Sequence, residues 1–263
     1  MDTEETTKKE QIYIVTDADY FPQKALELAT LIANAHEKSV CFLYIPSKGQ
    51  LDKSYQLAQW CLHSEVKEGL SYHILEDDDF TDFMERNEAA AVLFELSKES
   101  LYNHPKKPLQ ICRELRIPYY FVKPDQVISL ERVLVPVGFL VEEREKGVFC
   151  SGMGRYFHSE LLLMTANDYG SRAKENTTAI QSLLDKFQLN YTFVSAKKDS
   201  FKIELEAMQR SEELKASLLL ISASRDYGMD DILFGPKEQK VIKNSTIPVM
   251  VLNPRKDLYA LCS

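Results

Sequence analysis

Two short segments of the chain repeat one pattern of prolines and apolar residues, and this repeat restricts the possible folds more than any other feature. The segments are Ile117–Pro124 and Ile247–Pro254, so the interval between them is 130 residues (118 to 248, and 124 to 254). In each segment two prolines enclose an apolar run, which is typical of a short strand with abrupt ends. Because the chain has 263 residues, the interval predicts two consecutive copies of one module of ordinary domain size.

Each half also alternates between apolar runs and amphipathic segments. Continuous apolar runs are expected of strands that are buried on both faces, and apolar residues spaced by three and four are expected of helices. The strands that we expect are 12–15, 40–45, 72–75, 90–94 and 118–123, then 133–137, 161–166, 191–194, 218–222 and 248–252. The helices that we expect are 22–36, 50–66, 79–87 and 106–116, then 142–157, 172–187, 202–214 and 236–244.

Strict alternation of strand and helix predicts an α/β fold, because each strand then returns to a parallel sheet through a right-handed helical crossover. We expect two tandem modules, each a five-stranded parallel sheet with helices on both faces, as in Rossmann-like folds. The boundary is expected between Lys123 and Glu131, which divides the chain into residues 1–127 and 128–263.

The charge of the chain argues against binding to nucleic acids or to anionic membranes. Acidic residues outnumber basic ones by 40 to 32, which gives a formal net charge of −8, and the basic residues form no stripe. The amino terminus is polar where a secretory signal would be apolar, and no apolar run reaches the length of a membrane span. The five cysteines are widely spaced. We therefore expect a cytoplasmic protein with reduced cysteines.

The second half carries the residues that suggest a family. The segment Leu218–Gly235, followed by an expected helix and the strand 248–252, resembles the carboxyl-terminal signature of universal stress proteins. The run Val133–Val137 resembles their first strand. The resemblance covers both halves in layout, and its motifs lie in the second. It implies the adenine nucleotide alpha hydrolase-like fold of that family, some members of which bind ATP.

The ATP-binding signature of that family is altered here. In ATP-binding members a strand ends in a loop with two glycines three residues apart, and a Gly-Ser or Gly-Thr pair later opens the next helix, so that backbone N–H groups face the phosphates. In this chain Ser222 and Arg225 stand at the two glycine positions, and Gly235 is retained. Pro236 follows it and has no N–H to donate. Together with Ser224, these residues form a degenerate nucleotide or anion cleft that is poorly suited to a triphosphate.

Arg225 has two interpretations. Its guanidinium could bind a small anion in the cleft. It could also pair with one of the nearby acidic residues, and local pairing is the more common outcome for an arginine in an acidic loop. The acidic residues in question are Asp226, Asp230 and Asp231.

In the first half, the resemblance places Asp17 where family members often hold an acidic residue close to the adenine and ribose. The second half has Gly138 at the corresponding position. The expected phosphate loop of the first half, residues 95–105, contains no glycine. Neither half is therefore expected to form a complete ATP site.

Two other motifs have structural interpretations that outweigh functional ones. The acidic run Glu76–Asp79 lacks the spacing of a calcium loop, and acids before an amphipathic segment normally cap a helix. Gly152 and Gly154 lie inside an expected helix, not between strand and helix, so they indicate close helix packing or a helix irregularity. No metal site is expected.

These observations favour a binding or regulatory protein of the universal stress type, involved in stress response and without catalysis. No cofactor is expected, because Ser222, Arg225 and Pro236 disfavour ATP and AMP. The alternative is an adenine-nucleotide switch or weak ATPase that uses Asp17 or the Ser222 cleft with magnesium. A third possibility is a purely structural partner. The ligand would be a small anion or another protein, and a homodimer is possible. The two closing strands are expected to meet inside one chain, as in the dimers of single-domain relatives.

Overall fold

The computed structural model describes residues 10–46, 52–64, 70–76, 79–224 and 236–255. The first half contains β1 (Gln11–Thr16), α1 (Gln23–His36), β2 (Ser39–Tyr44), α2 (Ser54–His63), β3 (Leu70–Ile74), α3 (Phe80–Arg86), β4 (Ala91–Glu95), α4 (Lys106–Ile111) and β5 (Tyr119–Val122). The second half contains β6 (Arg132–Val137), the 3-10 turn η1 (Val141–Glu145), α5 (Lys146–Phe157), β7 (Glu160–Thr165), α6 (Arg172–Lys186), β8 (Tyr191–Ser195), α7 (Ile203–Arg210), β9 (Leu218–Ser222), α9 (Lys237–Asn244) and β10 (Val249–Leu252).

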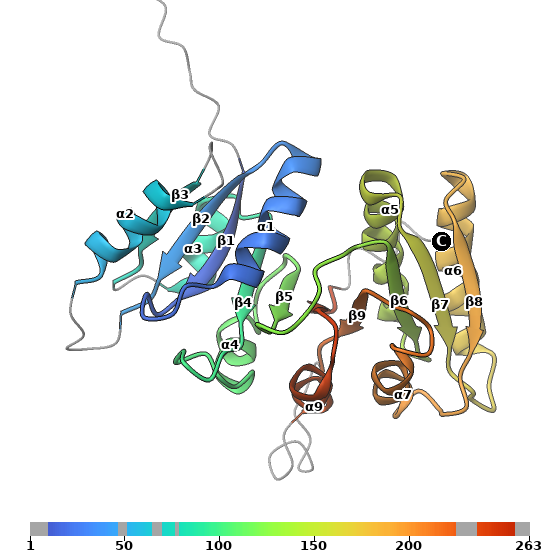
Figure 1. Cartoon of the computed structure of the whole chain (residues 1–263). Helices are drawn as coiled ribbons and strands as arrows, with labels where there is room; N and C mark the ends of the chain where they lie inside the picture. The colour runs from blue at the N-terminus through green and yellow to red at the C-terminus, as the bar shows by residue number, and fades with distance from the viewer. Residues whose placement is uncertain (1–9, 47–51, 65–69, 77–78, 225–235, 256–263) are drawn as a thin grey trace, which may run out of the picture.

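All ten strands form one sheet in the order β3-β2-β1-β4-β5-β10-β9-β6-β7-β8. The first five strands and the last five follow the same connection order, and they occupy the left and right of Figure 1. Every pair is parallel except β5 and β10, which pair antiparallel with Met250 opposite Tyr120. The predicted α/β fold is confirmed, and so is the expected meeting of the two closing strands.

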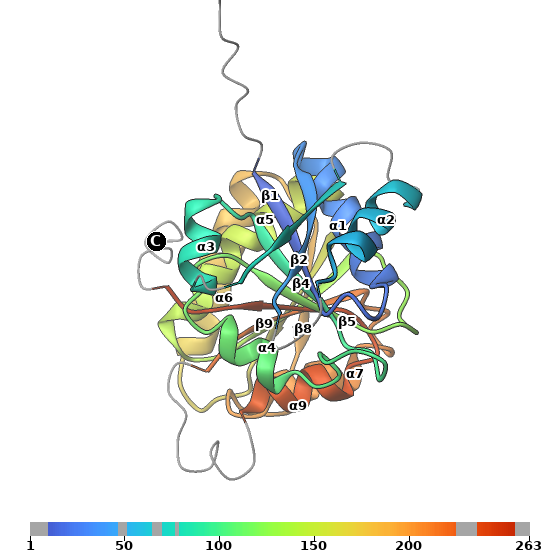
Figure 2. The same ribbon diagram turned by 90° about the vertical axis from the view of Figure 1, so that its left-hand side faces the viewer.

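Helices cover both faces of the sheet (Figure 2). Apolar side chains of α1, α2, α5 and α6 share one core layer, and those of α3, α4, α7 and α9 share the other. The inner strands, such as β4 and β9, are buried on both faces, as their continuous apolar runs predicted, whereas the edge strands β3 and β8 are partly exposed.

Four expected helices differ in extent from the prediction. The helix expected over 50–66 is α2, which begins at Ser54 and ends at His63. Residues 142–157 form η1 followed by α5, because Glu143 turns its side chain back to the N–H of Gly138. The segment 106–116 is helical only to Ile111, since the later carbonyls of Cys112 and Leu115 accept hydrogen bonds from Asn253. The segment 202–214 is helical from 203 to 210 and then continues as turns.

The junction between the halves is reinforced by a reciprocal pair of side chains. Asn253, just after β10, donates from Nδ2 to the carbonyls of Cys112 at 2.7 Å and Leu115 at 2.9 Å, beyond the end of α4. Lys123, just after β5, donates from Nζ to the carbonyls of Lys243 at 2.8 Å and Ser245 at 2.7 Å, at the end of α9. Each half therefore satisfies carbonyl groups at the end of the other half's last helix.

Candidate functional site

Ligands of open parallel sheets bind beyond the carboxyl ends of two neighbouring strands whose connections leave in opposite directions. In the first half these strands are β1 and β4, and in the second half they are β6 and β9. Asp17 follows β1, and Ser222 and Ser224 lie at the end of β9. Both crevices are rich in buried carboxylates.

In the first crevice, Asp17 holds two loops together. It is 3% exposed. One carboxylate oxygen accepts from the N–H groups of Asp19 at 3.0 Å and Tyr20 at 3.4 Å. The other accepts from the Ser100 hydroxyl at 2.7 Å and the Leu101 N–H at 2.5 Å. Asp17 thus binds the loop after β4 directly, and both of its oxygens are engaged within the chain.

Glu95, the last residue of β4, occupies the amino end of α1. Its Oε2 accepts from the N–H groups of Lys24 at 2.7 Å and Ala25 at 2.9 Å, and its Oε1 accepts from the Tyr20 hydroxyl at 2.8 Å. The first turn of a helix presents N–H groups that attract anions. Here a buried carboxylate of the protein takes that position, so these donors do not face a ligand.

The second crevice contains a cavity of about 430 Å³ at the carboxyl ends of β6 and β9. Its wall includes Gly138 after β6, Ser224 after β9, Glu204 at the start of α7 and Lys237 at the start of α9. Lys237 is the one basic side chain among the described residues that line it, and Glu143 and Glu204 are acidic. This lining favours neither a triphosphate nor another highly charged anion.

Glu143, which lines this cavity, belongs to a buried ion pair. Lys146 is fully buried, and its Nζ donates to Glu143 at 2.8 Å and to the carbonyl of Pro136 at 2.6 Å. Glu143 also accepts the N–H of Gly138 at 3.1 Å. Burial opposes ionisation of Glu143, but Lys146 and the Gly138 N–H outweigh burial and lower its pKa. The pair fixes the loop that follows β6.

On the β9 side, Glu238 takes the two donors of Ser224, which follows β9. Ser224 donates to its carboxylate from N at 3.2 Å and from Oγ at 2.9 Å. Burial, with the nearby charge of Glu204, raises the pKa of Glu238. Glu204 pairs with Lys237 at 3.0 Å. Burial alone would lower the pKa of Lys237, but the surrounding carboxylates raise it.

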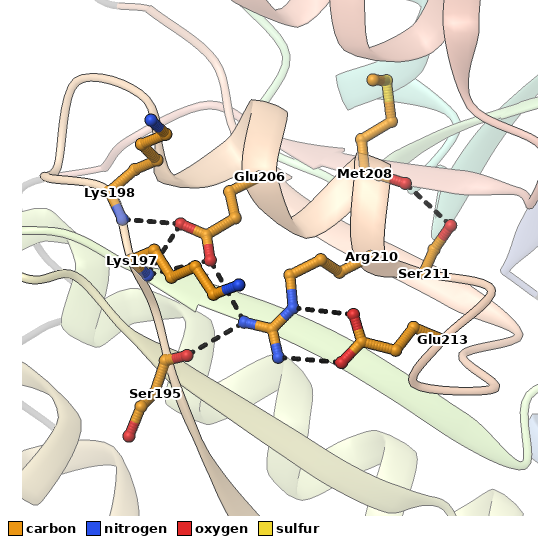
Figure 3. Close-up of polar contacts among 8 residues, drawn as sticks. All are labelled: Ser195, Lys197, Lys198, Glu206, Met208, Arg210, Ser211 and Glu213. Carbon is orange, nitrogen blue, oxygen red and sulfur yellow. Dashed lines mark hydrogen bonds and ion pairs between the residues drawn. The ribbon is translucent and has the colours of Figure 1, made fainter.

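The loop after β8 is also held by a carboxylate of the chain, that of Glu206 (Figure 3). Glu206 accepts from the N–H groups of Lys197 and Lys198 at distances from 2.7 to 3.0 Å, and from Arg210 at 3.1 Å. Arg210 also donates to the Ser195 carbonyl at 2.9 Å. Burial opposes ionisation of Glu206, but these donors outweigh it and lower the pKa. Loop N–H groups are again satisfied by a carboxylate of the protein.

The structure places the other predicted site residues as follows. Ser222 ends β9 and is 8% exposed. Arg225 and Gly235 lie outside the described residues, as do the three acidic residues considered as partners of Arg225. Pro236 precedes α9. The crevices of Asp17 and Ser224 belong to different halves, so the fold does not combine them in one site.

The structure also shows the expected helix cap, and it explains one of the two glycines of α5 by close packing. Asp79 caps α3 by accepting from the N–H groups of Thr81 and Asp82. A Cβ on Gly154 would lie 2.9 Å from Leu189, so close packing explains that glycine, whereas a Cβ on Gly152 would meet nothing within 4 Å. Within the described residues there is no group of three side chains suited to a metal, and no helix is both long and apolar enough to cross a membrane.

Sequence reasoning missed the carboxylates that define these crevices. Glu143, Glu204 and Glu238 lie in segments that read as ordinary charged helix starts. Glu95 offered a signal, because it ends an otherwise apolar strand where a charged residue must find buried partners.

The titration of Glu95 gives a test of this arrangement. Burial raises the pKa of Glu95 above its ordinary value of 4.5, against the lowering effect of its hydrogen bonds. The folded chain therefore holds this proton more tightly than the unfolded chain, so the contribution of Glu95 to stability is complete below pH about 4.5 and declines as the pH rises through the folded pKa. We expect the free energy of unfolding of the native protein, minus that of Glu95→Gln, to fall over this range in urea titrations. The exposed Glu99→Gln is the matched control. A difference for Glu95→Gln that grows with pH would contradict the burial of Glu95.

Comparisons with known proteins agree with this fold. No family model and no curated protein sequence matches the chain. Among solved structures, a universal stress protein from Archaeoglobus fulgidus is similar with a TM-score of 0.66 and 14% identity, over 94% of this chain and 97% of that one. A putative universal stress protein from Pseudomonas aeruginosa UCBPP-PA14 has a TM-score of 0.64 and 13% identity, over 97% of this chain and 96% of that one. A functionally unknown protein from Pseudomonas aeruginosa PAO1 has a TM-score of 0.61 and 15% identity, over 97% of this chain and 95% of that one. The chain therefore has the fold of the universal stress proteins over nearly its whole length.

Proposed function

We propose that this chain is a cytoplasmic binding or regulatory protein of the universal stress type, which acts in stress response without ATP binding or catalysis of its own. The observation that supports this most is the use of the crevice donors by buried carboxylates. Glu95 takes the N–H groups at the start of α1, and Glu238 takes those of Ser224. A phosphate group would have to displace these carboxylates or lie beside them, and either arrangement is unfavourable in a buried setting.

We also propose that residues 1–127 and 128–263 are two modules arranged as an intramolecular pseudo-dimer. The matching strand order of the two halves and the antiparallel pairing of β5 with β10 support this. A protein partner or a small ligand would then bind one chain where a single-domain relative presents a dimer.

The second candidate is an adenine-nucleotide switch or weak ATPase. The cavity of about 430 Å³ beside Lys237 favours it, because the cavity lies where nucleotide-binding folds hold their ligand. On this alternative, Lys237 would contact a phosphate, and Glu204 and Glu238 would lie near magnesium.

Calorimetric titration of the full chain with ATP, ADP, AMP and cyclic AMP, with and without Mg²⁺, distinguishes the two candidates. We expect no saturable heat for any of the four at concentrations up to about 1 mM, which corresponds to binding weaker than about −4 kcal/mol. Micromolar binding of a nucleotide that Lys237→Met weakens at least tenfold would establish the second candidate instead. The exposed Lys174→Met serves as the matched control.

A further inference from the structure

A second cavity lies on the face of the sheet that α1 and α5 cover, at the junction of β5 and β10. Its volume is about 210 Å³, and it is lined by Tyr120 and Met250 from the sheet, Ile32 from α1, and Phe149 and Gly152 from α5. Two basic residues, His36 and Lys38, also line it, and Lys38 is paired with Glu10. An apolar cavity of about 150 Å³ is known to accept a benzene ring. The size and lining therefore match one substituted aromatic ring.

Gly152 creates part of this space. Phe149, Gly152 and Met153 share one face of α5, since they are three and four positions apart, and all three line the cavity. A Cβ at position 152 would meet nothing within 4 Å, in contrast to Gly154 on the same helix. Glycine inside a helix is unfavourable relative to alanine. At position 152 no close packing compensates for this cost in helix stability. The absence of a side chain there leaves open space beside the helix.

Tyr120 supplies a hydroxyl that no described residue engages at the wall of the cavity. It is 3% exposed, it lines the cavity, and its hydroxyl makes no hydrogen bond to any residue that the structure describes. A tyrosine hydroxyl at the edge of a core can donate to a ligand while its ring stays packed. The neighbouring Tyr119 belongs to the opposite core layer, and its hydroxyl donates to Asn253 at 2.9 Å. Burial strongly raises the pKa of Tyr120, so its hydroxyl remains a neutral donor.

We propose that this cavity binds a small aromatic molecule with one hydrogen-bond acceptor, which accepts from the Tyr120 hydroxyl while its ring packs on Phe149 and Met153. None of the described lining residues is acidic, so no carboxylate repels an acceptor oxygen. The ligand would touch α1 and α5 together and would therefore stabilise the contact between the two halves. This site is distinct from both crevices and does not depend on the function proposed above.

The test uses acetophenone as the probe and α-methylstyrene as its isostere without the carbonyl acceptor. The full chain is labelled with ¹³C at its methionine methyl groups. We expect acetophenone to shift the signals of Met153 and Met250 saturably, with a dissociation constant on the order of 1 mM, and to leave Met208 of α7 unchanged. Absence of shifts at Met153 and Met250 would overturn the proposal.

Two variants test the two parts of the proposal. Tyr120→Phe should weaken acetophenone about five- to tenfold and leave α-methylstyrene unchanged, because it removes only the donor. Tyr119→Phe, in the opposite core layer, should affect neither probe. Gly152→Leu should abolish binding of both probes while the chain keeps or raises its melting temperature, because leucine fills open space on a helix. Equal weakening of both probes by Tyr120→Phe, or unchanged binding in a folded Gly152→Leu variant, would contradict the assignment.

Discussion

Replacing Lys146 with methionine is expected to lower the free energy of unfolding by about 3–5 kcal/mol, because the substitution leaves the buried carboxylate of Glu143 without its closest cation. Lys146 has no exposed surface, and its Nζ lies 2.8 Å from Glu143 and 2.6 Å from the Pro136 carbonyl. Methionine has a similar length and is apolar, so the loss reports charge and hydrogen bonding more than volume. Urea denaturation at pH 7 measures the effect.

The matched control is Lys174→Met, an exposed lysine on α6, which should change stability by less than about 0.5 kcal/mol. The double variant Glu143→Gln/Lys146→Met should be more stable than the sum of the single losses predicts, because the two residues interact directly. A loss below about 1 kcal/mol for Lys146→Met would show that the pair is not buried as described.

Removing Asn253 should uncouple the two halves at their junction. Asn253→Ala removes two hydrogen bonds to the carbonyls of Cys112 and Leu115 and one from the Tyr119 hydroxyl. We expect a loss of about 3 kcal/mol, from roughly 1 kcal/mol for each bond in a partly buried setting. Lys123→Met, at the corresponding position after β5, should lose about 2 kcal/mol.

These junction variants are compared with Lys243→Ala, an exposed side chain on α9 that should leave stability unchanged. Hydrogen exchange locates the effect. Amides of β5 and β10 should exchange faster in Asn253→Ala, whereas those of β2 and β7, distant from the junction, should change only with global stability. Stability within about 0.5 kcal/mol of the native protein for both junction variants would contradict the reciprocal role of Asn253 and Lys123.

The fold was largely predictable because buried parallel strands leave a clear signal. The apolar runs placed all ten strands within a few residues, and the proline pattern at 117–124 and 247–254 indicated the closing strands that pair in the sheet. Helix ends were less predictable. The end of α4 depends on Asn253, which follows the helix by more than 140 residues, and such long-range partners leave no local pattern.

The crevices were predictable in position but not in chemistry. Asp17 and Ser222 lie at the carboxyl ends of strands, and this position can be predicted from the sequence. It cannot show that Asp17 binds Ser100 and Leu101, because those residues are more than 80 positions away along the chain. Glu143, Glu204 and Glu238 each resemble a solvated charge in sequence, and only packing shows that they are buried.

The proposed function depends on two carboxylates of the chain, Glu95 and Glu238, which take the N–H groups of Lys24, Ala25 and Ser224. The most direct measurement is the ATP arm of the calorimetric titration, carried out on the full chain with Mg²⁺ at pH 7.5. We expect no saturable heat at ATP concentrations up to about 1 mM. Stoichiometric binding with a micromolar dissociation constant would contradict the proposed function.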